Sequence, residues 1–532
     1  MFSALIYSFL FLSAHVFSIH AQEFFQEQLT LRPHRDGTVL GHFAFTTLLK
    51  SATPREPETI RIEDTSQHYT LFPLALGQVL REYAITELHL SLNAGKWSYD
   101  RWGYPEEDGV GTGAELWAWM AEGPGASVDE RWRGLRSNLA GLFCASLGSM
   151  DEQRTTSPSL TFLPEGDLPG PSTPYQLRHG TLPSENVCTE NLTPFLKLLP
   201  CKSLSGIASL LNPHRLFDAD WHGMGIHVRY VENAGVEVRL TFQGVFDPVR
   251  YSTDGKRDWS LHSIFDRTIQ KTCPVARHSK IRLISTTDAV DVSPAPNTFN
   301  AAFSVYDVNT VSKPLDISMQ WSNESHFEYP LSLDSPPPTH ISVRRTLKGT
   351  EQSRGQLAIV IENHQDKQIK ASYLETMPWL LQFHLNSIQV KWNSAPRDDL
   401  MSIVSYIPPV PHSRPTLLQS VLTLPPNGTM DLTIDVTKPF LRYTEHPPDA
   451  QRGWDLPPAV FRPLIIANDS NLRRLPRIYT PILLVDLATP DFSMPYNVII
   501  MSCTLIALIF GSVFNLLTRK FVLTKIPNEP PQ

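Results

Sequence analysis

The feature that most restricts the fold is an apolar run near the C-terminus, at residues 498–517. Its one strongly polar side chain, Asn515, lies close to the end of the run. A helix rises about 1.5 Å per residue, so a run of this length reaches roughly 30 Å, the thickness of the hydrocarbon core of a bilayer. We therefore expect a transmembrane helix at 498–517, and the chain before it must fold on one side of the membrane.

The charges that follow this run predict its orientation. Arg519, Lys520 and Lys525 come directly after it, and basic residues collect on the cytosolic side of a membrane helix. Residues 518–532 are then a cytosolic tail, and the proline-containing residues 489–497 are a stiff stem on the other side. The expected topology is that of a single-pass type I membrane protein with the bulk of the chain in the lumen.

Two further features agree with a lumenal location. Residues 1–21 are rich in Leu, Phe, Ile and Val and the chain turns polar at Gln22, which predicts a secretory signal peptide. Sequons of the form Asn-x-Ser/Thr, which become glycosylated in secreted and lumenal proteins, occur at Asn191, Asn323, Asn427 and Asn468. Chance is the alternative at this length, and Asn191 is the least favourable site because Pro194 follows its threonine and stiffens the loop.

Length and composition describe a folded protein of more than one domain. A chain of 532 residues has room for two or three domains, and 41% hydrophobic residues supply enough material for their cores. There are 46 basic and 53 acidic residues, giving a net charge of -7, and no basic block occurs. This balance argues against nucleic-acid binding.

The first part of the chain, residues 22–280, mixes strand and helix patterns. Hydrophobic alternation predicts hairpins at 24–49 and 226–242, and apolar residues three and four apart predict helices at 73–83 and 128–142. A shorter helix capped by Asp258 is expected after the second hairpin. These patterns indicate an N-terminal α+β domain.

One strand in this part carries polar residues on alternate positions. Residues 87–92 place three leucines on one side and Glu87, His89 and Ser91 on the other, so we expect one buried face and a solvated or hydrogen-bonded His89. The aromatic residues at 97–102 that follow favour a ladder packed over a core. A platform that stacks on carbohydrate is the alternative.

Residues 281–488 have a different character. Short strand patterns are separated by proline clusters, and no long amphipathic helix interrupts them. This is typical of antiparallel sandwich sheets. The predicted fold class is therefore mainly β with some helix (α+β): lumenal antiparallel β-sandwich-type domains followed by one C-terminal transmembrane helix.

Known catalytic motifs are missing from the sequence. His-Glu-x-x-His, Gly-x-Ser-x-Gly and paired Cys-x-x-Cys segments do not occur. The sequence DADWH at 218–222, with His214 before it, is the nearest approach to a metal cluster, and a polar loop is the favoured interpretation. We expect no catalytic residue, no metal site and no cofactor in this chain.

The segment at 186–201, NVCTENLTPFLKLLPC, holds two of the five cysteines. Cys188 lies in a polar, extended stretch beside the Asn191 sequon, and Cys201 ends a short apolar turn of chain. An exposed thiol in such a loop is suited to a bond with another chain. Spacing alone favours an ordinary bridge within the chain.

This segment resembles the signature of the phosphatidylinositol-glycan class T (PIG-T) family, subunits of the glycosylphosphatidylinositol (GPI) transamidase. Further stretches that resemble the family lie at 87–103, 113–120, 256–265, 374–381 and 489–499. The resemblance implies a non-catalytic subunit in the endoplasmic reticulum membrane that scaffolds and stabilises the catalytic subunit while the complex attaches GPI to proteins with C-terminal signals. It also implies that Cys188 forms a disulfide with that cysteine-protease-like catalytic subunit, and that other membrane subunits, the GPI lipid and proprotein substrates meet this chain within the complex.

The number of remaining cysteines limits how they can pair. If Cys188 pairs with another chain, the other lumenal cysteines allow one internal bridge and one free thiol. We expect a bridge between Cys201 and Cys273 and a buried free thiol at Cys144. The alternative functions are an independent lumenal carbohydrate-active enzyme that uses residues 97–107, and a cell-surface receptor.

Overall fold

The computed structural model describes residues 23–62, 68–170, 173–285, 290–300, 302–310, 314–329, 337–349, 351–442, 445, 453–464, 475–487, 493–519 and 523–524. The predicted signal peptide, the sequon at Asn468 and the basic residues Lys520 and Lys525 lie outside this part of the chain. The chain divides into two compact units, one of Met1–Lys438 with Asp455–Leu484 and one of Pro439–Trp454 with Val485–Gln532.

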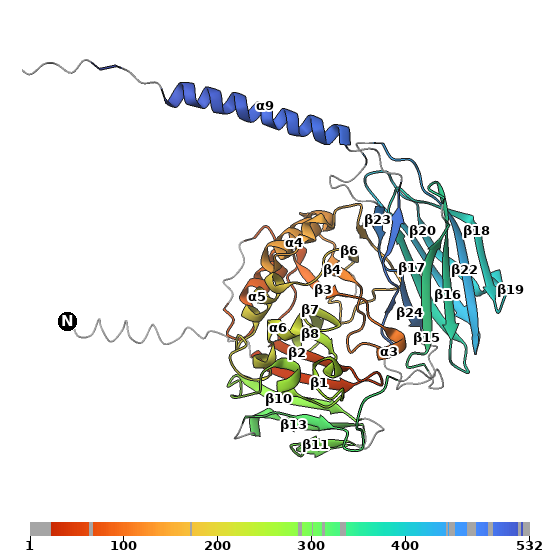
Figure 1. Ribbon diagram of the computed structural model, residues 1–532. Coiled ribbons are helices and arrows are strands. Elements are labelled where there is room, and N and C mark those ends of the chain that lie inside the picture. The colour runs from red at the N-terminus through yellow and green to blue at the C-terminus, as the bar shows by residue number, and fades with distance from the viewer. Residues whose placement is uncertain are drawn as a thin grey trace, which may run out of the picture. The chain divides into compact units, whose positions relative to one another are not determined.

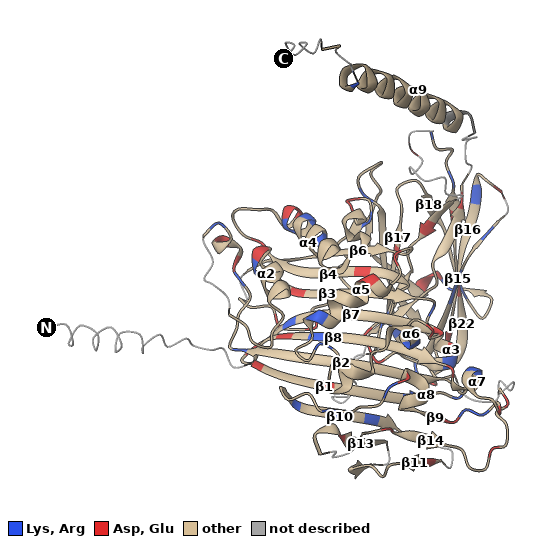
Figure 2. Ribbon diagram, turned by 60° about the vertical axis from the view of Figure 1, so that its left-hand side comes forward, with Lys and Arg blue, Asp and Glu red and all other residues tan. Residues whose placement is uncertain are grey.

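The first unit is built around an 11-stranded sheet with the order β12-β13-β10-β1-β2-β8-β7-β3-β4-β6-β5. Its strands are β1 (Glu23–Pro33), β2 (Val39–Lys50), β3 (Ile85–Ala94), β4 (Gly113–Ala121), β5 (Thr155–Thr156), β6 (Tyr175–Leu182), β7 (Trp221–Val231), β8 (Gly235–Phe246), β10 (Ala276–Ile284), β12 (Thr298–Phe299) and β13 (Phe303–Asp307). Figure 2 shows the middle strands of this sheet side by side. Both predicted hairpins are confirmed, as β1 with β2 and as β7 with β8.

Helices cover one face of this sheet. They are α2 (Leu74–Glu82), α4 (Val128–Phe143), α5 (Thr189–Leu198), α6 (Pro213–Leu216) and α8 (Leu261–Phe265), with η2 (Ser146–Ser149) and η3 (Ile207–Leu210). The short elements η1 (Pro57–Thr59) and α7 (Pro248–Tyr251) lie in connecting segments, and α3 (Tyr99–Trp102) carries Trp102 into a separate apolar cluster. The predicted helices at 73–83 and 128–142 are confirmed as α2 and α4. The Ser127 side chain caps α4 by accepting from the Glu130 N–H, and the helix buries Trp132, Leu135 and Leu139.

The expectation that Asp258 caps a helix was wrong. The helix α8 begins after Ser260, whose hydroxyl accepts from the Ser263 N–H. The Asp258 carboxylate instead accepts from the backbone N–H of Trp321, at 2.8 Å. A partner distant in sequence therefore competes successfully for this side chain, which a local capping pattern does not reveal.

The second part of the first unit is an antiparallel sandwich of two five-stranded sheets, as predicted. One sheet contains β15 (Ile341–Lys348), β16 (Arg354–Asn363), β22 (Gly428–Thr437), β18 (Gln382–Trp392) and β19 (Ala395–Pro396); the other contains β20 (Met401–Ile407), β21 (Thr416–Leu424), β17 (Ile369–Met377), β24 (Val460–Leu464) and β25 (Ile478–Tyr479). The η5 turn (Asp398–Leu400) precedes β20. Figure 1 shows these strands as a layer separate from the large sheet.

The strands between the two halves pair with the first half. The strands β10, β12 and β13 belong to the 11-stranded sheet, and β9 (Trp259–Ser260), β14 (Ser318–Gln320) and β11 (Asp291–Ser293) form a small sheet; the η4 turn (Val308–Thr310) follows β13. We therefore propose a domain boundary between Gln320 and Ile341 in place of the boundary at 281 that composition suggested.

The expectation that only one face of β3 is buried was wrong. Both faces are covered, and Glu87 and His89, on the side predicted to be polar, are 0% and 3% exposed. The sandwich covers that second face through a core in which Trp117 and Phe162 pack with Leu374 and other sandwich residues. Glu87 and His89 are therefore buried on this face, beside the loop at Glu165 and the ring of Trp117.

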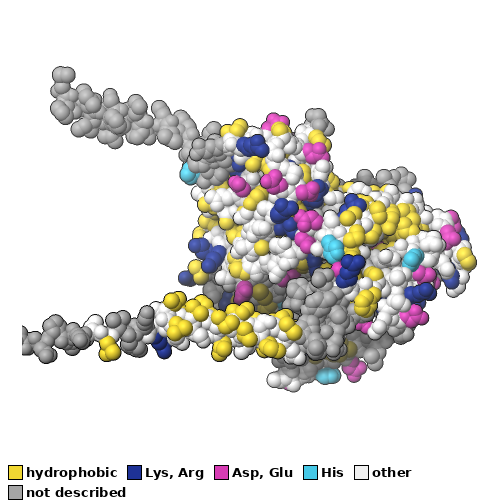
Figure 3. Space-filling view, turned by 90° about the horizontal axis from the view of Figure 1, so that it is seen from above, with side chains coloured by type: hydrophobic (Ala, Val, Ile, Leu, Met, Phe, Trp, Pro, Cys, Tyr) yellow, Lys and Arg dark blue, Asp and Glu magenta, His cyan; other side chains and the backbone are white. Residues whose placement is uncertain are grey.

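The second unit contains the helix α9 (Ser493–Thr518), together with parts of β23 (Gly453–Leu456) and β26 (Leu483–Asp486). Its residues Tyr496–Thr518 have a mean hydropathy of 2.2 and are long and apolar enough to cross a membrane. Figure 3 shows hydrophobic side chains around this helix. The helix begins at Ser493, so the second half of the predicted stem is helical.

Candidate functional site

The thiol singled out by the sequence lies at the junction of two helices. Cys188 is free and exposed, and it occupies the N-cap position of α5 in an extended conformation, with φ of -136°. Its backbone N–H donates to the Asn191 side-chain oxygen at 2.6 Å. The cysteine backbone is thus held by a local hydrogen bond, while the residue itself is exposed.

The sequon residue Asn191 is part of this junction. Its side-chain amide donates to the carbonyl oxygens of Phe143 and Cys144, at 2.8 and 3.2 Å, and the residue is only 1% exposed. A glycan on this nitrogen has no room in the folded chain. By contrast, the sequon residues Asn323 and Asn427 are exposed.

The other cysteines of the first unit divide into a bridge and a thiol. Cys201 and Cys273 form a disulfide with a Cα–Cα distance of 6.1 Å, which joins the chain after α5 to the chain before β10. Cys144 is free, but it is exposed and not buried as expected. The helix α4 ends at Phe143, and Cys144 takes the left-handed conformation with φ of 52° just past the helix end, where it is not covered as a residue of an interior helix would be.

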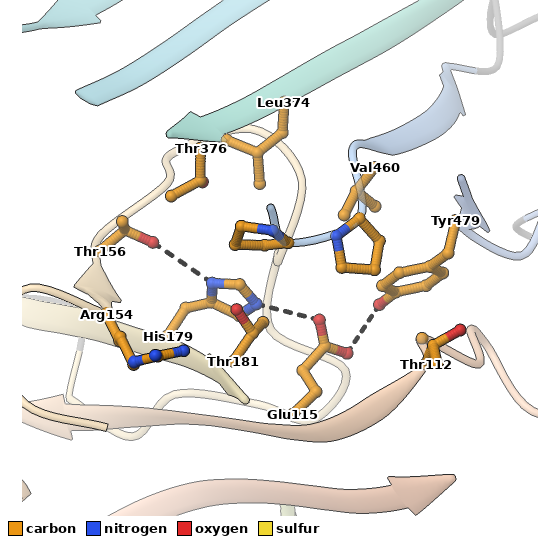
Figure 4. A pocket seen from close by; sticks show the side chains of 13 residues that line it. Thr112, Glu115, Arg154, Thr156, His179, Thr181, Leu374, Thr376, Val460 and Tyr479 are labelled. Carbon is orange, nitrogen blue, oxygen red and sulfur yellow. Dashed lines mark hydrogen bonds and ion pairs between the residues drawn. The ribbon is translucent and has the colours of Figure 1, made fainter. Parts of the chain in front are cut away.

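A buried polar cluster lies where the large sheet meets the sandwich. Figure 4 shows Glu115 of β4 between His179 of β6 and Tyr479 of β25. The Glu115 carboxylate lies 3.0 Å from His179 Nε2 and accepts from the Tyr479 hydroxyl at 2.8 Å. Burial and the neighbouring Glu115 charge raise the pKa of Tyr479 well above its usual range, so the hydroxyl keeps its proton.

The pocket around this cluster is too small for a substrate. Its free volume is about 10 Å³, which is room for about one water molecule. The Thr156 hydroxyl lies 3.3 Å from the remaining ring nitrogen of His179, so the polar groups of the pocket bond mainly to one another. The arrangement is suited to joining two domains.

A second cluster surrounds Glu107, one of the two acidic residues of the alternative enzyme hypothesis. Its carboxylate lies 3.0 Å from His42 Nε2 and 2.6 Å from Arg239. Burial acts to raise the pKa of Glu107, but Arg239, His227 and His42 together bring it well below its usual range. The adjacent Glu106 points elsewhere and pairs with Arg32 at 3.4 Å. The two carboxylates therefore do not form an acid and base pair.

The neighbouring tryptophans pack inside the protein. Trp97 and Trp102 are 3% and 6% exposed, and their rings meet edge to face with centroids 5.2 Å apart. The Trp97 indole donates to the Gly103 carbonyl at 2.8 Å. The rings pack in a buried cluster, as expected, but residues 99–102 form the helix α3 and not a ladder, and these rings are not available to stack on a sugar.

A third buried group ties the loop at Glu165 to both domains. Arg477 of the chain before β25 lies 3.3 Å from the Glu165 carboxylate, and Glu87 accepts from the Glu165 and Gly166 N–H groups, each at 2.8 Å. Burial acts to raise the pKa of Glu165, but His89 and Arg477 outweigh it and lower the value to about 2. Glu165 is therefore charged in the folded chain.

The predicted polar loop at 218–222 carries ordinary ion pairs. Asp218 and Asp220 lie 3.0 and 3.9 Å from Arg250. Among the described residues, no group of three or more His, Cys, Asp or Glu side chains is arranged to hold a metal ion.

The sequence patterns did not predict that these polar side chains form buried clusters. Their members come from β2, β3, β4, β6, β7, β8, the loops at Glu107 and Glu165 and the chain around β25, which are far apart in sequence. The available signal was the presence of Glu87, His89 and Glu115 within otherwise apolar strands. Charged residues at such positions need partners when a second layer covers them.

Comparison with known proteins gives a consistent family. The family model of Gpi16, described as the Gpi16 subunit and a GPI transamidase component, matches residues 9–254 and 248–530. The chain is 34% identical to the human GPI-anchor transamidase component PIGT, over 93% of this chain and 90% of the human protein. It is 30% identical to the GPI transamidase component GPI16 of Saccharomyces cerevisiae, over 94% of this chain and 89% of the yeast protein.

A solved structure adds nothing about function. An exo-β-N-acetylglucosaminidase from Vibrio harveyi covers 28% of this chain and 19% of its own length, at 12% identity and a TM-score of 0.16. A similarity of this size does not support an inference about fold or function.

Proposed function

The chain belongs to the Gpi16 family of GPI transamidase components, and from this premise we propose that it is a non-catalytic subunit that scaffolds and stabilises the catalytic subunit. In this proposal, the peptide-bond chemistry takes place on the partner chain. GPI lipid and proprotein substrates meet this protein through the complex, which also contains other membrane subunits.

The observation that carries the proposal is the exposed, unbridged thiol of Cys188 at the start of α5. We assign to it the interchain disulfide with the cysteine-protease-like catalytic subunit, as the family resemblance implies. The two thiols lose two protons and two electrons, which an oxidised dithiol carrier of the lumen takes up by thiol–disulfide exchange. A covalent link keeps the partner at a high effective concentration beside a membrane-bound substrate.

Two features of the first unit support a non-catalytic role. The buried acidic and histidine side chains are used to join the large sheet to the sandwich, as the Glu115 cluster illustrates. The pocket beside that cluster has room for about one water molecule. Both features are those expected of a rigid platform for another protein.

The proposed setting is the endoplasmic reticulum membrane. The apolar helix α9 supports a single membrane crossing, and Arg519 directly after it supports a cytosolic C-terminus. The two preceding domains then lie in the lumen, where disulfides form and persist. The bridge between Cys201 and Cys273 is consistent with this compartment.

The lumenal location also predicts glycosylation. We propose Asn323 and Asn427 as acceptors because both are exposed, together with Asn468 outside the described residues. Substitution of either exposed asparagine by glutamine should remove the mass of one glycan on a gel. A change with Asn191→Gln, or no change with both exposed sites, would contradict the assignment.

A non-reducing gel of the intact complex tests the proposed function. We expect a band that contains this chain and the catalytic subunit, which disappears under reduction and in Cys188→Ser. The variant Cys144→Ser is the matched control, because it removes another free, exposed thiol near the same junction. Persistence of the band in Cys188→Ser, or transfer of GPI to proteins by this chain purified alone, would overturn the proposal.

A further inference from the structure

We propose that Asn191 is a positioning residue for the interchain bond, and that its sequon serves as a backbone clamp without carrying a glycan. This inference rests on the proposed role of Cys188. It assigns to Asn191 the task of holding the Cys188 backbone against the end of α4, so that the thiol is presented in one orientation.

The clamp consists of three hydrogen bonds from one buried side chain. The Asn191 oxygen accepts from the Cys188 N–H at 2.6 Å, and the nitrogen donates to the carbonyls of Phe143 and Cys144, at 2.8 and 3.2 Å. One amide therefore satisfies the start of α5 and the end of α4 together. Such backbone groups have no partners within their own helices.

The chemistry of the clamp is specific to asparagine. It needs one acceptor directed at an N–H and two donors directed at two carbonyls, which a planar carboxamide supplies. Aspartate has the same shape but offers only acceptors when ionised, so it meets the two carbonyl oxygens with repulsion. Alanine leaves all three backbone groups without this partner.

The apolar contacts of α5 do not depend on the clamp. Leu192 and Phe195 are 1% and 0% exposed and belong to the main core of the first unit. The Cys201–Cys273 bridge ties down the chain that follows α5. Loss of the Asn191 amide should therefore loosen Cys188 at the helix start while these contacts retain the helix.

The clamp also accounts for the sequon. The glycan acceptor nitrogen of Asn191 makes two hydrogen bonds inside the protein, and the residue is 1% exposed. A sugar on that nitrogen is incompatible with the observed packing of Asn191 between the start of α5 and the end of α4. Thr193, by contrast, is exposed, and its hydroxyl bonds only to the Thr189 carbonyl, at 3.2 Å.

This difference provides a matched control. Thr193→Ala destroys the sequon and keeps the clamp, whereas Asn191→Ala destroys both. Asn191→Asp also destroys the sequon, keeps the side-chain volume and loses the two donors. A glycan role predicts the same defect in all three variants, and a clamp role spares Thr193→Ala.

The measurement is the redox equilibrium of the interchain bond. The intact complex is equilibrated in buffers of reduced and oxidised glutathione, and the linked fraction is read on a non-reducing gel. Each linkage consumes one oxidised glutathione and releases two reduced ones, so the midpoint is the ratio of [GSH]² to [GSSG]. This ratio reports how well the two thiols are aligned, and overall stability does not set it.

We expect the midpoint ratio to fall about tenfold in Asn191→Ala and in Asn191→Asp, because a loosely held thiol has a lower effective concentration. Thr193→Ala should stay within about twofold of the parent. Equal midpoints in the parent and both Asn191 variants would overturn the inference, and so would an equal fall in Thr193→Ala. Absence of any interchain band in the parent would instead overturn the proposed function.

Discussion

The contact between the large sheet and the sandwich leads to a quantitative prediction for Tyr479→Phe. The Tyr479 hydroxyl donates to the buried Glu115 carboxylate at 2.8 Å and lies 3.2 Å from Arg477 Nε. The substitution keeps the ring in its apolar cluster and removes only the hydroxyl. One carboxylate oxygen of Glu115 then loses a hydrogen bond in a site with little room for water.

The expected cost follows from the charge of the acceptor. Hydrogen bonds to charged groups contribute roughly 1.5–3 kcal/mol, and a buried acceptor left without its donor loses an amount in that range. We expect Tyr479→Phe to lower the free energy of unfolding by about 2 kcal/mol. For a cooperative unit of roughly 200 residues this corresponds to a fall in Tm of about 5 °C.

The assay is thermal unfolding of the full chain, with Tyr406→Phe as the control. Tyr406 is 37% exposed on β20, and the same loss of a hydroxyl there should change the free energy by less than about 0.5 kcal/mol. A double-mutant cycle with Glu115→Gln should give a coupling of at least about 0.5 kcal/mol. The reasoning fails if Tyr479→Phe matches the control, or if the two substitutions are additive.

Two other predictions concern buried ionisable side chains. Arg345→Leu removes the partner of Glu375, whose side chain is 0% exposed, and should cost about 3–5 kcal/mol in thermal unfolding; Arg344→Leu, at a side chain that is 71% exposed, should cost less than about 1 kcal/mol, and similar costs would contradict this account. Burial lowers the pKa of His227 from 6.5 to about 3, so below pH 6.5 the unfolded chain binds a proton that the folded chain does not. Stability contributed by neutral His227 should therefore fall as the pH drops from about 6.5 towards 3, and His227→Gln should flatten the dependence of Tm on pH across that interval; an unchanged slope would refute it.

The buried polar clusters would support the proposed scaffold role by making the first unit rigid. A subunit that holds a partner at a set place needs domains that do not move freely, and charged groups buried between the sheet and the sandwich favour one arrangement, because any other leaves a charge unpaired. The pair of Arg477 and Glu165 is an example, at 3.3 Å and with both side chains largely buried.

Local patterns in the sequence were sufficient to predict much of this fold. The hairpin of β7 and β8 and the helix α4 follow from the period of hydrophobic residues, α9 from a continuous apolar run, and the antiparallel sandwich from short strand patterns separated by proline clusters. The resemblance carried by the segment around Cys188 was sufficient to predict the family. These inferences succeed because each depends on neighbouring residues or on one contiguous motif.

Only the tertiary structure decided which surfaces are covered. Glu87 and His89 alternate with leucines like a solvated strand face, yet the loop at Glu165 and the ring of Trp117 cover them. The sequence pattern at Asn191 is that of a glycan acceptor, yet its amide donates to the carbonyl of Phe143 at the end of α4. Cys144, expected to be buried, is exposed at the same helix end. The physical reason is that the period of a strand or helix shows which side chains share a face, whereas burial depends on a second layer brought from elsewhere in the chain by long-range packing.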